Sequence, residues 1–417
     1  MAEPYGLLVA GFNYAGAAED EFHDWYDTEH VPERVRTKGF INADRWLGVD
    51  NPKVAIATYD LETLSVLQSP DYLKIGGVNL SPWSKRVSAK CERVCRFEAN
   101  QVVPGQQAAP PVAEFDAAGN FLQGWGGPGE GFEWPGTEHG ISIDDHGFVW
   151  IGGSGTGSAT ELGDDAILKF TKSGEFVMQI GRRGASTGNT DTANVHGAAD
   201  AVVHDGEVFV ADGYGNRRII VFDAETGAYK RMWGAFGNVP TDPSPSDPPA
   251  SDEGEGAPQF DLVHAVRVSN DGLVYVSDRR NKRVQVFRPD GTYLSQVFLS
   301  RGAFPPSTLP GTAFGTPIKE LADGLVAGRM TASRTAFSPD PEQQFLYVVD
   351  RIKQSIAILD RKSLAFLGEF GDGVGSAPGS FYILHDVATD SQGNVYTAEV
   401  NDNGNRRAQK FAFTGMK

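Results

Sequence analysis

The chain has 417 residues, which is long enough for two or three domains. Its formal net charge of −17 excludes nucleic acid and anionic membranes as main partners, because both need a basic surface. No apolar run approaches the roughly 18 residues of a membrane-spanning helix, and the N-terminal stretch lacks the pattern of a secretory signal. The only cysteines, Cys91 and Cys95, exclude a disulfide framework. We therefore expect a cytoplasmic protein with reduced thiols.

Residues 1–104 are predicted to form a small α+β domain with the order β-α-β-β-α-β. An apolar strand is expected over 7–14, a charged helix over 17–36, a hairpin over 40–49 and 53–61, a second helix within 62–90 and a last strand over 94–103. This is the order of a ferredoxin-like sheet. One face of such a sheet carries no helices, so a second copy of the domain is expected to cover it.

The segment EFHDWYDTEHVPERVRTKGF, residues 21–40, resembles the EthD-like proteins of the dimeric α+β barrel superfamily. The resemblance covers the first domain alone. It implies a homodimer formed through this domain and, in some members, a small-molecule pocket. His23 and His30 lie on the predicted helix, but no second acid or base stands at helical spacing from them. A surface or helix-end position is therefore expected for both, and a ligand-binding or catalytic role is the alternative.

Residues 105–111 (GQQAAPP) have the composition of a linker, and the segment 112–417 that follows is repetitive. Each repeat has an apolar strand, a turn with Asp and Gly, a strand that ends near Asp or Glu, a polar loop and two further strands. Five repeats begin at His139, Gly197, Val263, Arg334 and Leu384. A partial repeat over 112–126 supplies two outer strands. The motifs resemble NHL repeats, so the chain is predicted to be mainly β: a six-bladed NHL-type β-propeller behind a ferredoxin-like α+β domain.

One position of the repeat carries histidine in alternate blades. When the repeats are aligned on the glycine of their first turn, this position contains His139, Ala198, His264, Ser333 and His385. The inner strands of a propeller line its channel, so the three histidines are expected to form a triangle around the axis. Three neutral imidazoles with an open fourth position are a typical zinc site. The alternative, that each is a buried histidine with an ordinary partner, explains the repetition less well.

The loop after the second strand of a blade returns to the histidine face. Tyr214 and Arg279 lie in two such loops and are expected close to the metal. A phenol beside a divalent cation can act as a base, and a guanidinium can hold an anionic or carbonyl oxygen. These loops are polar in any propeller, so a merely solvated position is the alternative for both residues.

The propeller contains the motifs EHGISIDDHG, VADGYGNRR, LVHAVRV together with SDRRNKR, and LHDVATDSQGNVY. Through these motifs it resembles the peptidylglycine amidating lyases. These zinc enzymes split an α-hydroxyglycine carbinolamide into an amide and glyoxylate. The resemblance implies His139, His264 and His385 as zinc ligands, Tyr214 as base and Arg279 as a substrate-holding residue. It also implies a structural calcium bound by the Asp386 carboxylate and the Ile141 carbonyl.

Two departures limit the resemblance. The family's first full blade carries a substrate-binding arginine, whereas the corresponding blade here has lost its inner half, and no arginine maps onto the missing one. Peptide amidation also belongs to secreted proteins.

The sequence therefore predicts a metal-dependent lyase, with hydrolase as second choice, that cleaves a C–N or C–O bond of a small molecule. A non-catalytic NHL scaffold is the main alternative. A third alternative is a calcium-dependent lactonase-like propeller. It would require carboxylate and amide ligands in the channel, where this sequence has histidines instead.

Overall fold

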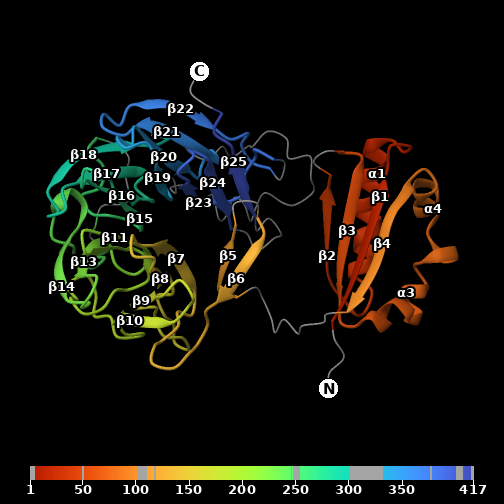
Figure 1. Ribbon diagram of the computed structural model, residues 1–417, viewed down its shortest axis with the longest axis horizontal. Helices are drawn as coiled ribbons and strands as arrows, with labels where there is room; N and C mark the ends of the chain where they lie inside the picture. Colours follow the sequence, from red (N-terminus) through yellow and green to blue (C-terminus); the bar gives the residue numbers. More distant parts are fainter. Residues whose placement is uncertain are drawn as a thin grey trace. The chain divides into compact units, whose positions relative to one another are not determined.

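The chain forms two compact units, Met1–Ala109 and Pro110–Lys417 (Figure 1). The computed structural model describes residues 5–48, 51–100, 110–116, 119–245, 247, 254–300, 332–375, 378–400 and 407–414. The boundary between the units falls within the predicted linker 105–111, of which 105–109 lie outside the described residues. In the part of the chain that the structure describes, no helix is long and apolar enough to cross a membrane.

The first unit contains one antiparallel sheet with the strand order β2-β3-β1-β4. Its strands are β1 (Gly6–Asn13), β2 (Phe40–Leu47), β3 (Val54–Leu61) and β4 (Glu92–Asn100). Between β1 and β2 the chain forms α1 (Glu19–Trp25), a π-helical turn (Tyr26–His30) and α2 (Val31–Val35) without a break. The apolar side chains Phe22, Trp25 and Tyr26 recur three and four residues apart, so they share the buried face of this helical segment.

The connection from β3 to β4 differs from the single helix predicted within 62–90. It consists of short pieces: η2 (Leu64–Gln68), α3 (Pro70–Leu73), η3 (Gly77–Asn79) and α4 (Pro82–Ser88). Proline is tolerated in the first turn of a helix but not in its interior, so Pro70 and Pro82 each begin a new helix. The hydroxyls of Ser69 and Ser81 accept hydrogen bonds from the backbone N–H groups at these two starts.

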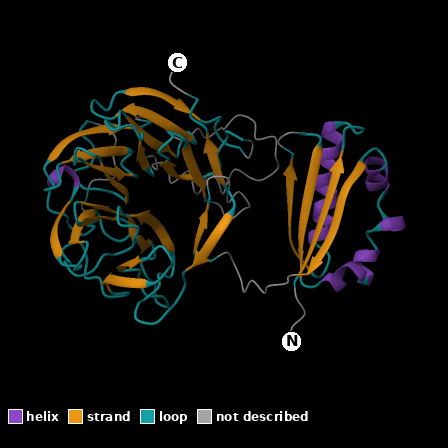
Figure 2. Cartoon of the chain, viewed as in Figure 1, coloured by secondary structure: helices purple, strands orange, loops and turns teal. Residues whose placement is uncertain are grey.

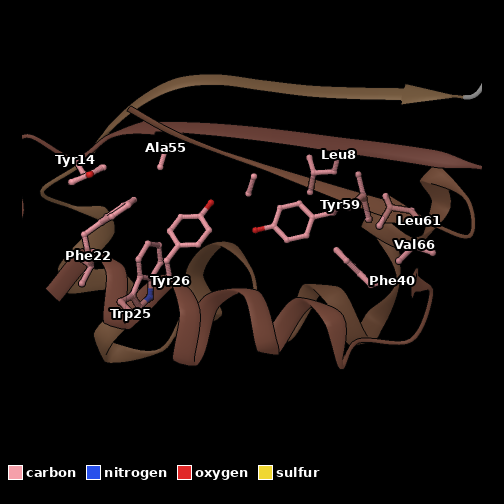
Figure 3. Packing of buried hydrophobic residues seen from close by; sticks show 13 residues of the cluster. Leu8, Tyr14, Phe22, Trp25, Tyr26, Phe40, Ala55, Tyr59, Leu61 and Val66 are labelled. Carbon is pink, nitrogen blue, oxygen red and sulfur yellow. The ribbon is translucent and has the colours of Figure 1, made fainter. Parts of the chain in front are cut away.

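The core of the first unit lies between the sheet and the helical segments, where Figure 3 shows its side chains. Tyr14 and Phe22 stack with ring centroids 4.0 Å apart. Leu8 and Tyr59 reach this layer from β1 and β3. Strand residues alternate between the two faces of a sheet, so the side chains next to these in sequence lie on the opposite face.

The second unit contains strands and loops almost throughout (Figure 2). Among the described residues it has four four-stranded sheets, one three-stranded sheet and one two-stranded sheet, all joined in chain order. The two-stranded sheet is β5 (Val112–Phe115) and β6 (Phe121–Trp125). The first two complete sheets are β7 (Glu138–Ile143), β8 (Val149–Gly153), β9 (Ala166–Phe170) and β10 (Phe176–Gly181), then β11 (Ala198–His204), β12 (Glu207–Asp212), β13 (Arg218–Asp223) and β14 (Tyr229–Trp233).

The remaining sheets repeat this plan. They are β15 (Val263–Val268), β16 (Val274–Asp278), β17 (Arg283–Phe287) and β18 (Tyr293–Phe298); β19 (Thr335–Phe337), β20 (Phe345–Asp350), β21 (Ser355–Asp360) and β22 (Phe366–Phe370); and β23 (Leu384–Thr389), β24 (Val395–Glu399) and β25 (Ala408–Phe411). The first strands β7, β11, β15, β19 and β23 are neighbours in succession (Figure 1). Sheets arranged radially with these strands innermost are the blades of a β-propeller, as the repeats predict.

Candidate metal centre

Four inner strands, β7, β11, β15 and β23, each have a break in strand pairing at or next to the position where the sequence alignment places the histidines. In β7 and β11 the pairing with the next strand skips Gly140 and Ala199; in β15 and β23 it skips His264 and His385. Each skipped residue is a β-bulge, which leaves the ladder and redirects the neighbouring side chains. The bulges lie at or directly after the aligned position, so they account for several strands presenting side chains to one point.

His139, His264 and His385 come together at this point. One ligand nitrogen of each lies within 4.8 Å of the corresponding nitrogens of the other two. The imidazole centroids are 5.0 Å apart for His139 and His264, 5.1 Å for His139 and His385, and 4.8 Å for His264 and His385. Within the described residues, this is the one group of three or more His, Cys, Asp or Glu side chains with metal-binding spacing.

Hydrogen bonds fix the tautomers of two of these histidines. The Nδ1 atom of His139 lies 2.7 Å from the Ala199 carbonyl oxygen, and Nδ1 of His264 lies 2.7 Å from the Ser333 carbonyl oxygen. A carbonyl oxygen can only accept, so each Nδ1 carries the proton and each Nε2 presents a lone pair. A backbone carbonyl in this role is the usual second-layer support of a metal-binding histidine.

The three imidazoles are neutral at pH 7. Burial disfavours the charged ring, and the positive charge of Arg334 adds to it, so the pKa of His139 falls to about 4. Burial likewise lowers the pKa of His264 and of His385 well below the usual range, and Arg279 contributes to both shifts. Metal binding would therefore require no proton to be displaced from these nitrogens near neutral pH.

Tyr214 reaches the histidines from the loop after β12. Its hydroxyl oxygen lies 3.1 Å from Nε2 of His139 and 3.2 Å from Nε2 of His264. The glycines on either side permit this close approach: a Cβ on Gly213 would come within 2.0 Å of the Val263 carbonyl oxygen, and one on Gly215 within 1.9 Å of the His196 ring. The motif Gly-Tyr-Gly therefore lets the loop pack directly on its neighbours while the tyrosine points at the cluster.

Arg279 lies beside Tyr214, in the equivalent loop after β16. Its side chain interacts with the Tyr214 hydroxyl, and the residue is only 4% exposed. Its Nε atom is buried and has no hydrogen-bond partner. A buried guanidinium with an unused donor, close to the histidines, is suited to hold an oxygen of a bound molecule.

A cavity of about 320 Å³ begins at Tyr214. Phe260 and Leu262 line it with apolar surface, and Arg217 and Arg280 line it with charge. The two arginines are paired with Asp247 and Asp261 respectively. The cavity thus adjoins the Tyr214 loop, whereas neither Arg279 nor any of the three clustered histidines belongs to its lining.

Of the two predicted calcium ligands, Asp386 has an arginine beside it. The Asp386 carboxylate lies 3.6 Å from Nε of Arg334, a residue that is 2% exposed. Ile141 lies on β7 with half of its surface exposed. Calcium binding by these two residues stays a prediction.

Sequence reasoning missed Arg334 and its partner Asp200. Arg334 ion-pairs with Asp200 at 2.6 Å, and both side chains are buried. A signal was present in the same alignment: the residues that directly follow the histidine position are Gly140, Ala199, Ala265, Arg334 and Asp386. Opposite charges in one column of the repeat indicate an ion pair between blades.

The other described histidines lie apart from the cluster. His146 is exposed in a turn. His196 pairs with the buried Asp165 at 2.7 Å, which raises the pKa of this imidazole. In the first unit, His23 lies 2.8 Å from the Arg45 guanidinium, whereas His30 packs against Trp25 with ring centroids 4.5 Å apart. His30, for which a surface or helix-end position is expected, is the last residue of the π-helical turn and is packed against its neighbours.

Comparisons with known proteins place one family match within the second unit. The NHL repeat model matches residues 260–287, which span β15 to β17 and include His264. A probable peptidyl-alpha-hydroxyglycine alpha-amidating lyase of Caenorhabditis elegans is 31% identical over 153 residues, which are 36% of this chain and 36% of that protein. NHL repeat-containing protein 3 of Mus musculus and of Homo sapiens are each 26% identical over 187 residues, 43% of this chain and 46% of theirs.

The chain thus spans less than half the length of these curated relatives. Among solved structures, a virginiamycin B lyase from Staphylococcus aureus aligns over 67% of this chain and 71% of its own, with 13% identity and a TM-score of 0.37. A streptogramin B lyase aligns over 67% of this chain and 69% of its own, with 12% identity and a TM-score of 0.36. The family model and the curated relatives therefore support NHL repeats, with partial similarity to an amidating lyase.

Proposed function

We propose that the propeller is a zinc-dependent lyase that cleaves a C–N or C–O bond of a small molecule. Hydrolysis by the same site is the second choice. The observation that carries the proposal is the convergence of three neutral imidazoles on one point, with ligand atoms within 4.8 Å of one another. The partial similarity to an amidating lyase supports the reaction class.

The residues fit a zinc ion better than a hard cation. Zinc favours nitrogen donors in a tetrahedral shell and keeps a fourth position open in catalytic sites. Calcium needs six to eight oxygen ligands, which the three imidazoles do not offer. His139 and His264 present free Nε2 atoms on the side of the Tyr214 hydroxyl. When bound, zinc would supply Lewis-acid polarisation of a substrate oxygen.

Tyr214 is the proposed general base. Its hydroxyl oxygen lies within 3.2 Å of two imidazole nitrogens, so it is positioned before substrate arrives. Once ionised to the phenolate, it would take the proton of a substrate hydroxyl; the hydroxyl-bearing carbon then becomes a carbonyl as the adjacent C–N or C–O bond breaks, and the leaving group takes the bonding electrons and a proton. Arg279 holds a carboxylate or carbonyl oxygen of the substrate with its unused donor.

Elemental analysis of the purified chain tests the proposal. We expect about one zinc per chain, and loss of that zinc in His264→Ala, because His264 is a buried member of the cluster. His146→Ala is the matched control, since His146 lies exposed in a turn outside the cluster. A wild-type chain that stays free of transition metal after reconstitution would reject the enzyme and favour a propeller that serves as an interaction scaffold.

We also propose that the propeller has six blades. The four complete sheets, the three-stranded sheet β23-β24-β25 and the two-stranded sheet β5-β6 make six sheets among the described residues. On this scheme β5 and β6 are the outer strands of a first blade without inner strands. The histidines then belong to the second, fourth and sixth blades, which accounts for their meeting at one point.

For the first unit we propose a ferredoxin-like domain that forms a homodimer. The strand order β2-β3-β1-β4 supports the ferredoxin-like assignment. The sheet face opposite the helices carries the exposed apolar side chains of Trp46 and Phe97, which are 59% and 61% exposed. Exposed aromatic side chains gathered on one face favour an interaction between copies.

A cavity in the first unit favours a second candidate function, the binding of a small molecule. It measures about 750 Å³ and lies between strands β1 and β4 and the helical connections. Apolar side chains such as Phe12 and Trp25 line it together with His30, Arg34 and Arg93, and no carboxylate of the described residues belongs to its lining. This composition suits an apolar or aromatic molecule with one acidic group.

Isothermal titration with benzoate and with the neutral analogue benzamide tests this second function. Binding of benzoate alone, weakened in Arg34→Gln, is expected because Arg34 is a largely buried cation of the lining. Arg86→Gln is the control, since Arg86 is exposed and lies outside the lining. Equal binding of both compounds, or of neither, would contradict an acid-binding cavity.

A further inference from the structure

A buried group of charges lies behind the histidine cluster and joins four inner strands. Asp200 on β11 is 1% exposed and receives ion pairs from Arg334, at 2.6 Å, and from Arg267 on β15. Arg334 directly precedes β19, and its Nε lies 3.6 Å from the carboxylate of Asp386 on β23. The positive and negative charges are therefore equal in number, two arginines against two aspartates.

Arg334 also contacts the carbonyl that supports a histidine. Its Nη2 donates to the Ala199 carbonyl oxygen at 3.2 Å, and the same oxygen accepts the Nδ1 proton of His139 at 2.7 Å. The Ser333 carbonyl, next to Arg334 in sequence, accepts the Nδ1 proton of His264 at 2.7 Å. One guanidinium thus forms ion pairs with two carboxylates and a hydrogen bond to a backbone carbonyl, the oxygen types that bind hard cations in proteins.

Burial makes Arg334 important for Asp200. The two side chains are 2% and 0% exposed, so solvent cannot balance the Asp200 carboxylate if the guanidinium is removed. The pKa of Asp200 lies below its ordinary value although burial alone would raise it, because Arg267 and Arg334 stabilise the carboxylate. Asp386 is more exposed, at 36%, and lies beside the same guanidinium.

We propose that the Arg334 guanidinium takes the place of a structural divalent cation in this propeller. It joins β11 and β23 and holds the Ala199 carbonyl that positions His139, while the carbonyl of the preceding residue, Ser333, positions His264. The propeller is then independent of calcium, in contrast to the calcium site that the sequence resemblance implies at Asp386. Arg334 is a positioning residue, and its role in calcium independence does not rest on the proposed zinc chemistry.

Thermal unfolding of the full chain in EGTA and in millimolar calcium chloride tests the proposal. For the wild type we expect the same midpoint in both and no calcium by elemental analysis. Arg334→Ala leaves Asp200, Asp386 and the Ala199 carbonyl around a space without a cation. Its midpoint should fall in EGTA and rise with the logarithm of the calcium concentration, as linkage requires for a ligand that binds only the folded state.

Two further variants separate cation replacement from a general loss of packing. Arg267→Ala removes the other arginine of Asp200 but leaves Arg334 in place, so its midpoint should fall without responding to calcium. Arg334→Lys keeps a positive charge and should also be unresponsive. Magnesium at the same concentration should stabilise Arg334→Ala less, because it demands a stricter geometry than calcium.

Calcium bound to the wild type, or a wild-type midpoint that rises with calcium, would overturn the proposal. A folded Arg334→Ala that ignores calcium would overturn it equally, because its oxygen atoms would then not form a cation site. If Arg334→Ala does not fold in either buffer, the wild-type calcium content and the response of Arg334→Lys decide the question by themselves.

Discussion

The Tyr214 hydroxyl lies near two imidazole nitrogens at almost equal distances, 3.1 and 3.2 Å. The nitrogens present lone pairs, so the phenol proton can interact with only one of them at a time. A metal ion bound to both nitrogens would use those lone pairs. The arrangement therefore couples metal binding to release of the tyrosine hydroxyl from its hydrogen bond.

This coupling predicts the effect of Tyr214→Phe. The variant keeps the ring but loses the oxygen, so kcat on a cleaved substrate should fall by about 10²–10⁴-fold, the usual contribution of a general base. Zinc content should stay at the wild-type level, because the histidines are untouched. Tyr229→Phe, at a partly exposed position on the outer strand β14, is the control. Unchanged turnover in Tyr214→Phe would remove the tyrosine from the mechanism.

At the scale of the element, each complete blade must hold its polar loop against its second and third strands. In two neighbouring blades a buried ion pair does this: Arg218 at the start of β13 binds Asp212 at the end of β12 at 2.8 Å, and Arg283 binds Asp278 at 2.7 Å. All four side chains are fully buried. The guanidiniums also donate to the Asn189 and Ala257 carbonyls in the segments that precede each blade, so each pair links two loops.

Removing one partner of such a pair leaves an uncompensated buried charge. Arg218→Leu should therefore lower the free energy of unfolding of the propeller by about 3–5 kcal/mol. Arg280→Leu breaks an exposed pair with Asp261 and should cost at most about 1 kcal/mol. Urea unfolding followed by circular dichroism measures both. Equal effects of the two substitutions would show that the buried pair has no special role.

The helical segment of the first unit predicts a dependence on pH. Burial and the nearby Arg34 lower the pKa of His30 to about 3, whereas the unfolded chain has a pKa near 6.5. The unfolded state therefore binds more protons between these values, and stability falls as the pH falls from 6.5 towards 3. The slope is at most about 1.4 kcal/mol per pH unit for this one group.

His30→Gln should flatten that dependence, because a neutral amide does not titrate. The measurement is chemical unfolding of the first unit at a series of pH values, followed by tryptophan fluorescence. His146→Gln, an exposed histidine of the second unit, should leave the curve of the first unit unchanged. A wild-type curve that stays level from pH 6.5 to 4 would contradict a neutral buried His30.

The repeat explains why the propeller and its histidines could be predicted. Identical turns fix the register of each blade, so three residues far apart in sequence fall on one structural position. The ion pair of Arg334 with Asp200 was not predicted, because Asp200 stands one position further along the repeat and the bulges shift the pairing, whereas Asp386 stands in the same column as Arg334. The sequence analysis predicts one helix within 62–90, whereas the connection from β3 to β4 consists of several short helices because Pro70 and Pro82 each begin a new one. The predicted cytoplasmic location stays a prediction.

At the scale of the whole molecule, the open sheet face of the first unit decides the oligomeric state that we expect. Val9 pairs with Phe97 across β1 and β4, and Trp46 pairs with Ile56 across β2 and β3. Leu8 faces the helices, so its neighbour Val9 and the side chains paired with it face the other way. The first unit alone does not cover this apolar face.

We therefore expect the chain to sediment as a dimer, and Phe97→Asp to sediment as a monomer, because a charge on this face would be buried in the dimer at high cost. Leu367→Asp is the matched control: Leu367 is 54% exposed on the outer strand β22 of the propeller. Sedimentation equilibrium measures both. Since the histidine cluster lies wholly within the second unit, the monomeric variant should keep the wild-type zinc content. A wild-type monomer would contradict the dimer, and loss of zinc on dissociation would show that the metal centre needs the first unit.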